Sequence, residues 1–160
     1  MARRERRYYY WVSHYGHLYV LDSPTVQDMP FGPTYLKDVR FLDFFYRRLR
    51  RTPNDDSLLA EFPWLSICGR ERNYIKASRT PIVFRELDDN QELTYAGSLA
   101  VPFQPDKLAL VNGELYHPSP NESTELSLVQ TNLASQLFEC FSEDGLHFRW
   151  KGETFPVEHR

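Results

Sequence analysis

The sequence predicts an α+β fold in which antiparallel β-hairpins, or a meander, combine with two amphipathic helices. Short runs rich in aromatic and β-branched residues alternate with turn signals, which is typical of antiparallel strands. Two longer segments carry apolar residues at the spacing of a helix face. The 160 residues suffice to bury a core without a metal or a disulfide. We therefore expect a basic N-terminal tail at residues 1–7 and a single α+β domain at residues 8–160.

The first half is predicted to open with a β-hairpin at residues 8–13 and 18–21, because Gly16 can adopt the positive φ of the turn between them. Three prolines and a glycine in residues 22–36 indicate a loop. Asp38 can cap the helix that follows, since its carboxylate can accept from the free N–H groups of the first turn. The expected apolar face of this helix consists of Phe41, Leu42, Phe45 and Leu49. Its last turn is expected to hold Arg47, Arg48, Arg50 and Arg51.

The rest of the chain is predicted to form short strands at residues 62–67, 73–76, 81–87 and 92–95. Asn112 and Gly113 predict a type I′ hairpin turn, because both residues tolerate positive φ. Ser127 and Gln130 form a capping box for a second helix at residues 128–141. The apolar stripe of that helix is expected to be Val129, Leu133 and Leu137. Residues 146–150 and 154–157 predict a closing hairpin.

The chain shows a weak internal repeat. Residues 16–19 and residues 113–116 share the pattern Gly-x-Leu-Tyr where a predicted hairpin returns. In each half a loop that contains proline follows, and then one amphipathic helix. The offset of about 97 residues is too long for a solenoid. The pattern therefore predicts two related βα modules packed into one domain.

The charge of the chain is unevenly distributed. Residues 1–85 hold 15 Lys and Arg against 9 Asp and Glu, whereas residues 86–160 hold 4 against 13. Two explanations stay open: the halves attract each other, or the basic half faces an anionic partner. Nucleic acid is disfavoured as that partner because the isoelectric point is near 5.9. No apolar run approaches the length of a membrane-spanning helix.

The N-terminus and the cysteines bear on location. The start contains four arginines in its first seven residues, which excludes a secretory signal. A remnant of a mitochondrial presequence and a solvated basic tail are both consistent with it. Cys68 and Cys140 are not spaced as a metal or redox pair. We expect two free thiols in a reducing compartment.

One stretch carries a family resemblance. Residues 62–73, Phe-Pro-Trp-Leu-Ser-Ile-Cys-Gly-Arg-Glu-Arg-Asn, resemble an uncharacterised protein family numbered 0598, whose animal members look mitochondrial. The likeness continues at residues 81–84, 101–105 and 112–118 and so covers most of the chain. A looser likeness is to a bacterial domain of unknown function numbered 1285, which also places a hairpin before a helix. Neither family has an established reaction, so the resemblance implies no catalytic residue. Together with the arginine-rich start, it implies a location in the mitochondrial matrix.

The candidate site residues centre on the Cys68–Asn73 loop. Arg70 and Arg72 could present two guanidinium groups on one face of an extended strand, which suits a phosphate or carboxylate. The alternative is structural: the arginines tie the loop to the acidic second half. His14 and His17 lack further convergent ligands, so we expect turn histidines in solvent and no metal site. The hypothetical ligand-binding residues are Cys68, Arg70, Glu71, Arg72, Asn73, Tyr116 and His117.

No common nucleotide, zinc-protease or hydrolase motif is present in the sequence. The sequence therefore favours a soluble, non-enzymatic interaction or assembly module with a protein partner, without cofactor or metal. The alternative is a protein or enzyme that binds a small anionic ligand through residues 68–73. These hypotheses differ in whether Arg70, Arg72 and His117 share one cleft.

Overall fold

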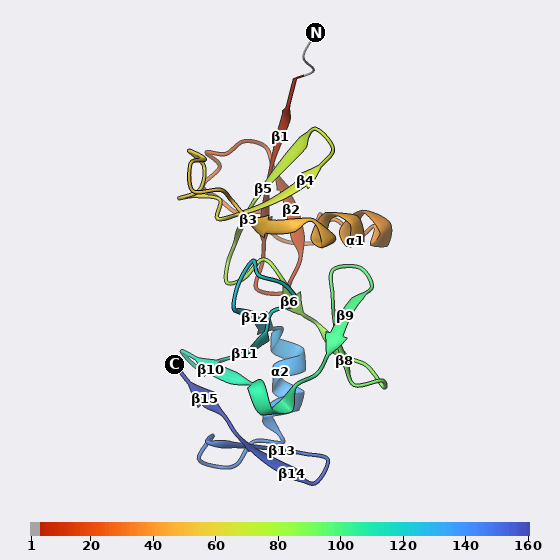
Figure 1. Ribbon diagram of the computed structural model, residues 1–160, viewed down its shortest axis with the longest axis vertical. Helices are drawn as coiled ribbons and strands as arrows, with labels where there is room; N and C mark the ends of the chain where they lie inside the picture. The colour runs from red at the N-terminus through yellow and green to blue at the C-terminus, as the bar shows by residue number, and fades with distance from the viewer. Residues whose placement is uncertain (1–3) are drawn as a thin grey trace.

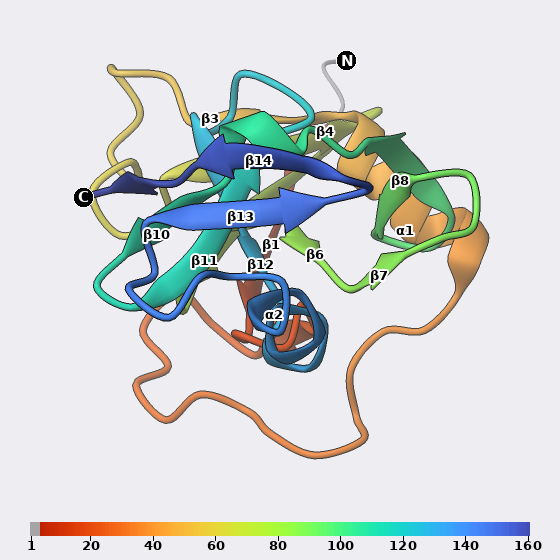
Figure 2. The same ribbon diagram turned by 90° about the horizontal axis from the view of Figure 1, so that it is seen from below.

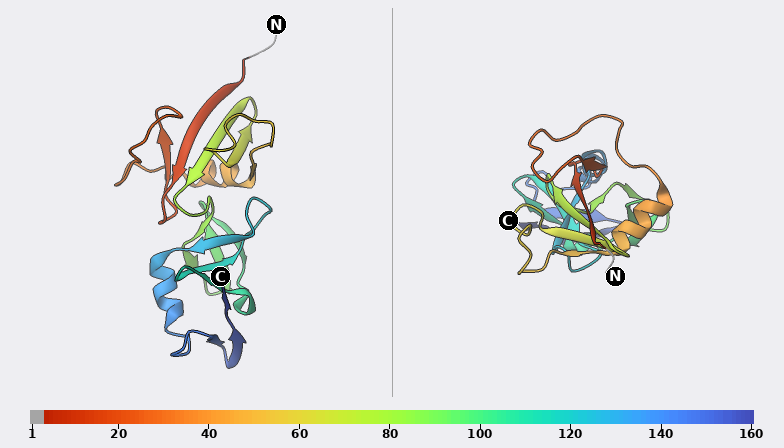
Figure 3. Two further views of the ribbon diagram at one scale, coloured as in Figure 1. Left: turned by 90° about the vertical axis from the view of Figure 1, so that its left-hand side faces the viewer. Right: turned by 90° about the horizontal axis from the view of Figure 1, so that it is seen from above.

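Two five-stranded sheets, one in each half of the chain, form the frame of the molecule. The computed structural model describes residues 4–160, so the first three residues of the expected tail lie outside it. The sheets belong to two lobes that follow each other along the long axis (Figure 1; Figure 3, left). The α+β class predicted from the sequence is confirmed. Neither helix in the described part is long and apolar enough to cross a membrane.

The first lobe is built around the sheet β2-β1-β5-β4-β3. Its strands are β1 (Arg6–Val12), β2 (Leu18–Leu21), β3 (Leu49–Arg51), β4 (Trp64–Cys68) and β5 (Glu71–Ala77). The predicted turn between β1 and β2 forms with Gly16 at φ +84°. β1 and β5 run parallel, and the other neighbours are antiparallel. β1 includes Arg6 and Arg7, which were expected in the basic tail.

The second lobe contains the sheet β15-β10-β11-β12-β6 and two smaller sheets. The five strands are β6 (Val83–Phe84), β10 (Ala109–Val111), β11 (Glu114–Pro118), β12 (Leu126–Val129) and β15 (Glu158–His159). A three-stranded sheet is formed by β7 (Glu86–Leu87), β8 (Glu92–Tyr95) and β9 (Leu99–Pro102). The closing hairpin consists of β13 (His147–Trp150) and β14 (Glu153–Pro156), which Figure 2 shows nearest the viewer. A short 3₁₀ turn, η1 (Pro105–Lys107), precedes β10.

The first helix, α1 (Val39–Arg47), begins where its cap predicted. The Asp38 carboxylate accepts a hydrogen bond from the backbone N–H of Phe41 at 2.8 Å. The helix ends earlier than expected, because Leu49–Arg51 pairs with β4 as an edge strand. Two arginines assigned to the last turn, Arg50 and Arg51, therefore belong to β3. Phe41 was expected in the core, but it is 36% exposed.

The second helix, α2 (Thr131–Phe138), is shorter at both ends than the predicted residues 128–141. Leu126–Val129 pairs with β11 and β6, so Val129 is a strand residue whose side chain is buried. Gln130 caps the helix, and its side-chain oxygen accepts from the N–H of Asn132 at 2.9 Å. Leu133 and Leu137 are buried as predicted. The pairing of β12 with the preceding strand β11 and with the distant strand β6 outweighs the local helical signal.

The lobes share one hydrophobic core across the waist of the molecule. Tyr10, Phe45 and Ile75 of the first lobe belong to the same buried cluster as Val83 and Leu128 of the second. The turn between β1 and β2 lies against β6: a Cβ on Gly16 would come within 3.0 Å of Val83. The relative position of the lobes is therefore maintained by close packing.

A buried carboxylate also joins α1 to the second lobe. Asp43 accepts hydrogen bonds from the backbone N–H groups of Gly97 and Ser98 at 3.1 and 2.8 Å, and from the Ser98 hydroxyl at 2.5 Å. Burial by itself raises the pKa of Asp43, but these hydrogen bonds outweigh it and hold the pKa below its ordinary value. A Cβ on Gly97 would lie 2.6 Å from the Val39 carbonyl oxygen, so only glycine allows this approach.

Candidate functional site

The Cys68–Asn73 segment forms the outer end of the β4–β5 hairpin. Cys68 ends β4, Gly69 turns the chain with φ +63°, and β5 begins at Glu71. Arg70 is exposed in the turn and Arg72 is half-buried on β5. The two arginines line one shallow hollow of about 370 Å³ together with Glu5, Ile67 and Gly69. The structure thus brings the two guanidinium groups to the same surface.

The polar groups of this hairpin find partners inside the first lobe. Arg72 pairs with Glu5 at 3.5 Å, and Glu71 lies 3.9 Å from Arg6. Asn73 donates to the Ser66 carbonyl across the strand pair at 3.0 Å. The expected tie to the acidic second half is therefore wrong. Within residues 4–160 a single ion pair joins residues 1–85 to residues 86–160, between Arg79 and Glu114 at 2.6 Å.

The other two candidate residues lie in the second lobe. Tyr116 and His117 are on β11, and both side chains are buried. His117 accepts from the Gln104 N–H through Nε2 at 2.9 Å, and its Nδ1 lies 2.9 Å from the Pro118 carbonyl oxygen. Burial lowers its pKa to about 4, so the imidazole is neutral near pH 7. The structure does not bring His117 into one cleft with Arg70 and Arg72.

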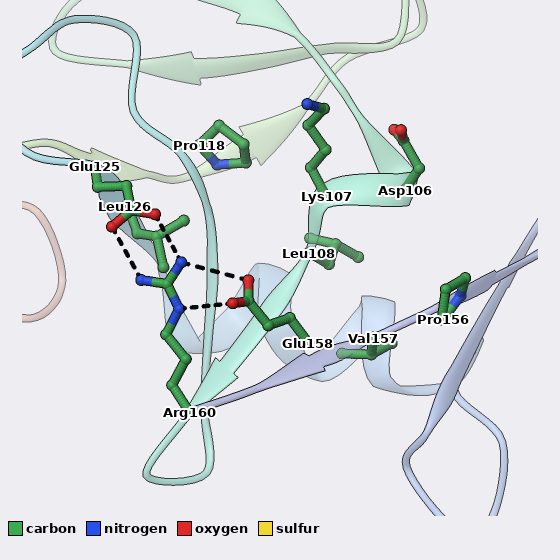
Figure 4. Close-up of a pocket in the computed structure, with 10 residues that line it drawn as sticks. All are labelled: Asp106, Lys107, Leu108, Pro118, Glu125, Leu126, Pro156, Val157, Glu158 and Arg160. Atoms are coloured by element: carbon green, nitrogen blue, oxygen red, sulfur yellow. Dashed lines mark hydrogen bonds and ion pairs between the residues drawn. The ribbon is translucent and has the colours of Figure 1, made fainter.

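A charged groove of about 560 Å³ lies between η1, the start of β12 and the end of the chain (Figure 4). Its apolar floor includes Leu108, Leu126 and Val157. Arg160 reaches across the groove to Glu125 at 2.7 Å and to Glu158 at 3.0 Å, as the dashed lines in Figure 4 show. One guanidinium therefore pairs with both carboxylates. Among the basic residues of this groove, Lys107 is in no ion pair within the described chain.

An aromatic cleft of about 420 Å³ lies beside the tip of the β1–β2 hairpin. One wall comes from the two strands, where Trp11 and Tyr19 are cross-strand partners with ring centroids 5.8 Å apart. The opposite wall is the loop of residues 22–36, fastened by a hydrogen bond from the Tyr19 hydroxyl to the Gly32 carbonyl at 2.8 Å. The lining residues are Trp11, Ser13, His14, Tyr15, His17, Tyr19, Pro30, Phe31, Gly32, Pro33 and Tyr35.

The rings at the hairpin tip lie close to one another, and one pair of them is stacked. His17 stacks on Tyr35 with centroids 3.7 Å apart and planes within 4° of parallel. On the same turn, the rings of His14 and Tyr15 lie 4.1 Å apart. Both histidines are half-buried, so the expectation of turn histidines in solvent is wrong. Burial, with smaller contributions from Arg85 and Lys37, lowers the pKa of His17 and favours a neutral ring near pH 7.

A polar groove of about 490 Å³ adjoins the aromatic cleft. Tyr15 and His17 line both spaces, so they separate the apolar surface from the polar one. Besides the β1–β2 turn, the polar groove is formed by Arg85, β7 and the start of α2, and it includes Gln130 and Asn132. Figure 2 shows α2 on the side of the molecule around which the long loop passes. The combined site offers aromatic faces at one end and hydrogen-bonding groups at the other.

Sequence reasoning missed this cleft although its signals are present. Alternation along β1 places Tyr9 and Trp11 on the face opposite Tyr8 and Tyr10, and Tyr10 is buried in the core. The loop carries Pro30, Phe31 and Pro33 in a short stretch, and Phe31 is 88% exposed. Only the folded loop brings these rings opposite the strands. The cleft could therefore be predicted only by considering the aromatic hairpin and the proline-containing loop together.

A family model described as Domain of unknown function (DUF4505) matches residues 1–160. The chain belongs to the DUF4505 family. A crystal structure of a DUF1285 family protein from Shewanella baltica OS155 is similar, with a TM-score of 0.53 over 83% of this chain and 92% of that chain. At 12% identity this likeness concerns the fold alone, and it supports the expected resemblance to domain 1285 at that level. The resemblance to the family numbered 0598 stays a prediction.

Proposed function

We propose that this DUF4505 protein is a non-enzymatic binding module whose aromatic cleft holds an extended, proline-containing segment of a protein partner. The observation that carries the proposal is the lining of the cleft, in which the Trp11 and Tyr19 rings of the strands lie opposite the Tyr35 ring and two prolines of the loop. Proline-rich segments adopt the polyproline II conformation before binding, so they lose little entropy when they dock on aromatic grooves.

Two further features support a peptide ligand. The Trp11 indole N–H makes no hydrogen bond within residues 4–160, so it can donate to a peptide carbonyl. The adjoining polar groove continues the site past Tyr15 and His17, where Gln130 and Asn132 offer hydrogen-bonding side chains. A small ligand would use the cleft alone, whereas an extended chain would use both spaces.

We expect a decaproline peptide to bind the full chain and Tyr35→Ala to weaken that binding by about tenfold, because a ring in the centre of the cleft is lost. Trp11→Phe retains the ring but removes the donor, and about a fivefold loss is expected. Isothermal titration calorimetry measures both, with thermal melts to confirm folding. The matched control is Trp150→Phe in the second lobe, which should bind like the wild type. Equal affinity for wild type and Tyr35→Ala would refute the proposal.

A second candidate function keeps the Cys68–Asn73 loop as a site for a small anion. The Nε atom of Arg72 is buried without a hydrogen-bond partner, and Arg70 is in no ion pair, both within the described residues. The carboxylate of Glu5 lines the same hollow and would repel an anion, so we rank anion binding below peptide binding in the aromatic cleft. We expect inorganic phosphate to raise the thermal midpoint of the wild type and not that of Arg72→Lys, which keeps the charge but loses the guanidinium fork. An equal rise in both proteins would exclude this site.

The mitochondrial matrix is our proposed location, from the sequence resemblance and the arginine-rich start. Imaging of a chain tagged at its C-terminus beside a matrix marker tests it.

We also propose that the two halves are related modules. In each, the first hairpin strand lies between its partner and a later parallel strand, in the orders β2-β1-β5 and β11-β10-β15. Superposition of the two halves tests this relation, and unrelated helix positions would contradict it.

A further inference from the structure

The outer face of α1 and the adjoining strand β3 collect basic and aromatic side chains. The buried side of the helix consists of Leu42, Asp43, Phe45 and Tyr46. Phe44 is 44% exposed on the opposite side, and Phe41 lies at the edge of that side. The exposed arginines of this surface, which we call the α1–β3 face, are Arg40, Arg47 and Arg48 of the helix and Arg51 of the strand, since the intervening Arg50 points to the other face of the sheet.

The four arginines of the α1–β3 face form no ion pair within the described residues, although Arg47 lies near enough to Asp43 to help lower the pKa of that carboxyl. The two acids of this region are engaged elsewhere, Asp38 with the first turn of α1 and Asp43 with the β8–β9 hairpin. A part of the basic excess of the first half therefore lies on one exposed surface, where it can meet an external anion.

Phe44 is already covered on one side by a cation. The guanidinium carbon of Arg48 lies 3.4 Å from the centre of the Phe44 ring, and its Nη1 donates to the Phe44 carbonyl at 2.9 Å. This arrangement occupies one face of the Phe44 ring. Stacking of a nucleic acid base needs an open ring face, usually within a basic groove. The helix instead lies on the outside of the molecule (Figure 1; Figure 3, right).

We propose that the α1–β3 face docks this protein on the surface of a bilayer that contains anionic phospholipids. The arginines would lie at the level of the lipid phosphates, to which a guanidinium donates two hydrogen bonds. Phe41 and Phe44 have no polar atoms, so their rings would enter the boundary between headgroups and acyl chains, as the apolar face of an interfacial helix does. The aromatic cleft is not part of this surface, so the inference is independent of the proposed function.

Vesicle co-sedimentation of the full chain tests the proposal. Vesicles of phosphatidylcholine with about 30% phosphatidylglycerol should bind the wild type, and vesicles of phosphatidylcholine alone should bind it weakly. The double variant Arg40→Gln, Arg47→Gln should bind the anionic vesicles about 25-fold more weakly, since each surface cation contributes about fivefold. Phe44→Ala should cost about fivefold, and raised salt should weaken wild-type binding.

The matched control is Arg149→Gln, Lys151→Gln, which removes two exposed charges from the β13–β14 hairpin and should stay within about twofold of the wild type. Thermal melts confirm that each variant folds. Three results would overturn the proposal: no binding to anionic vesicles at low salt, an equal loss in the control, or tighter binding of a labelled oligouridylate that Phe44→Ala abolishes. The last result would make the α1–β3 face a nucleic acid surface instead.

Discussion

Replacement of Phe45 with alanine is expected to lower the free energy of unfolding by about 3–5 kcal/mol, because it removes a large buried ring and leaves a cavity that closes only in part. The Phe45 side chain is completely buried at the waist between the lobes. Its ring contacts those of Tyr10, Phe41 and Tyr46, with centroids 5.0, 5.6 and 5.4 Å away. The cavity would therefore loosen α1 from the sheet of the first lobe.

Urea denaturation at neutral pH measures this loss, and Phe44→Ala is the matched control on the same helix. Phe44 is partly exposed, and apart from its contact with Arg48 it contributes little to the core. Its replacement should cost less than about 1 kcal/mol. Similar losses in the two variants would mean that α1 packs with another face inward.

The local elements of the fold could be predicted because their signals lie within a few residues. The turn at Asn112 and Gly113 shows the expected positive φ values of 51° and 80°. The β3, β9, β12 and β15 strands were missed, and each is four residues long or shorter. β15 pairs with β10, some 50 residues earlier, so only the tertiary structure selects it. Strands that depend on distant partners leave no pattern of their own in the sequence.

The candidate site was predicted less well than the fold for the same reason. The Cys68–Asn73 string is contiguous, and the structure keeps Arg70 and Arg72 together because one hairpin holds both. His117 was grouped with them on chemistry alone, although β11 belongs to the other lobe. The aromatic cleft needs the loop of residues 22–36 to fold back over β1 and β2, which composition does not specify.

Acid is expected to destabilise the protein between pH 6.5 and pH 4 because His117 must stay neutral to stay buried. Burial lowers its pKa from 6.5 to about 4, against smaller opposing effects of the Pro118 carbonyl and Asp106. The Gln104 N–H points at Nε2, so the neutral ring carries its proton on Nδ1 and faces the Pro118 oxygen. Protonation of Nε2 would break the first of these hydrogen bonds and bury a charge between Phe84 and Phe103.

The sign of this change in stability with pH follows from the number of protons that the folded and unfolded states bind. In the unfolded chain His117 takes up a proton as the pH falls below 6.5, whereas in the folded protein it does so only near pH 4. The unfolded state thus binds more protons throughout this range, and the free energy of unfolding falls as the pH falls. A shift from 6.5 to about 4 corresponds to a loss of about 3 kcal/mol, which is complete below the folded pKa.

Urea denaturation at pH 7.5 and pH 4.5 tests this with His117→Gln, whose amide oxygen can accept from Gln104 but does not titrate. The variant should be less stable than the wild type at pH 7.5, because glutamine fills the site less well. Its disadvantage should shrink by about 2–3 kcal/mol at pH 4.5, since the wild type alone carries the penalty of a histidine kept neutral. His147→Gln, an exposed position on β13, should leave the pH dependence of the wild type unchanged. If His117→Gln and the wild type lost the same stability over this range, the acid sensitivity would belong to the carboxylates and not to His117.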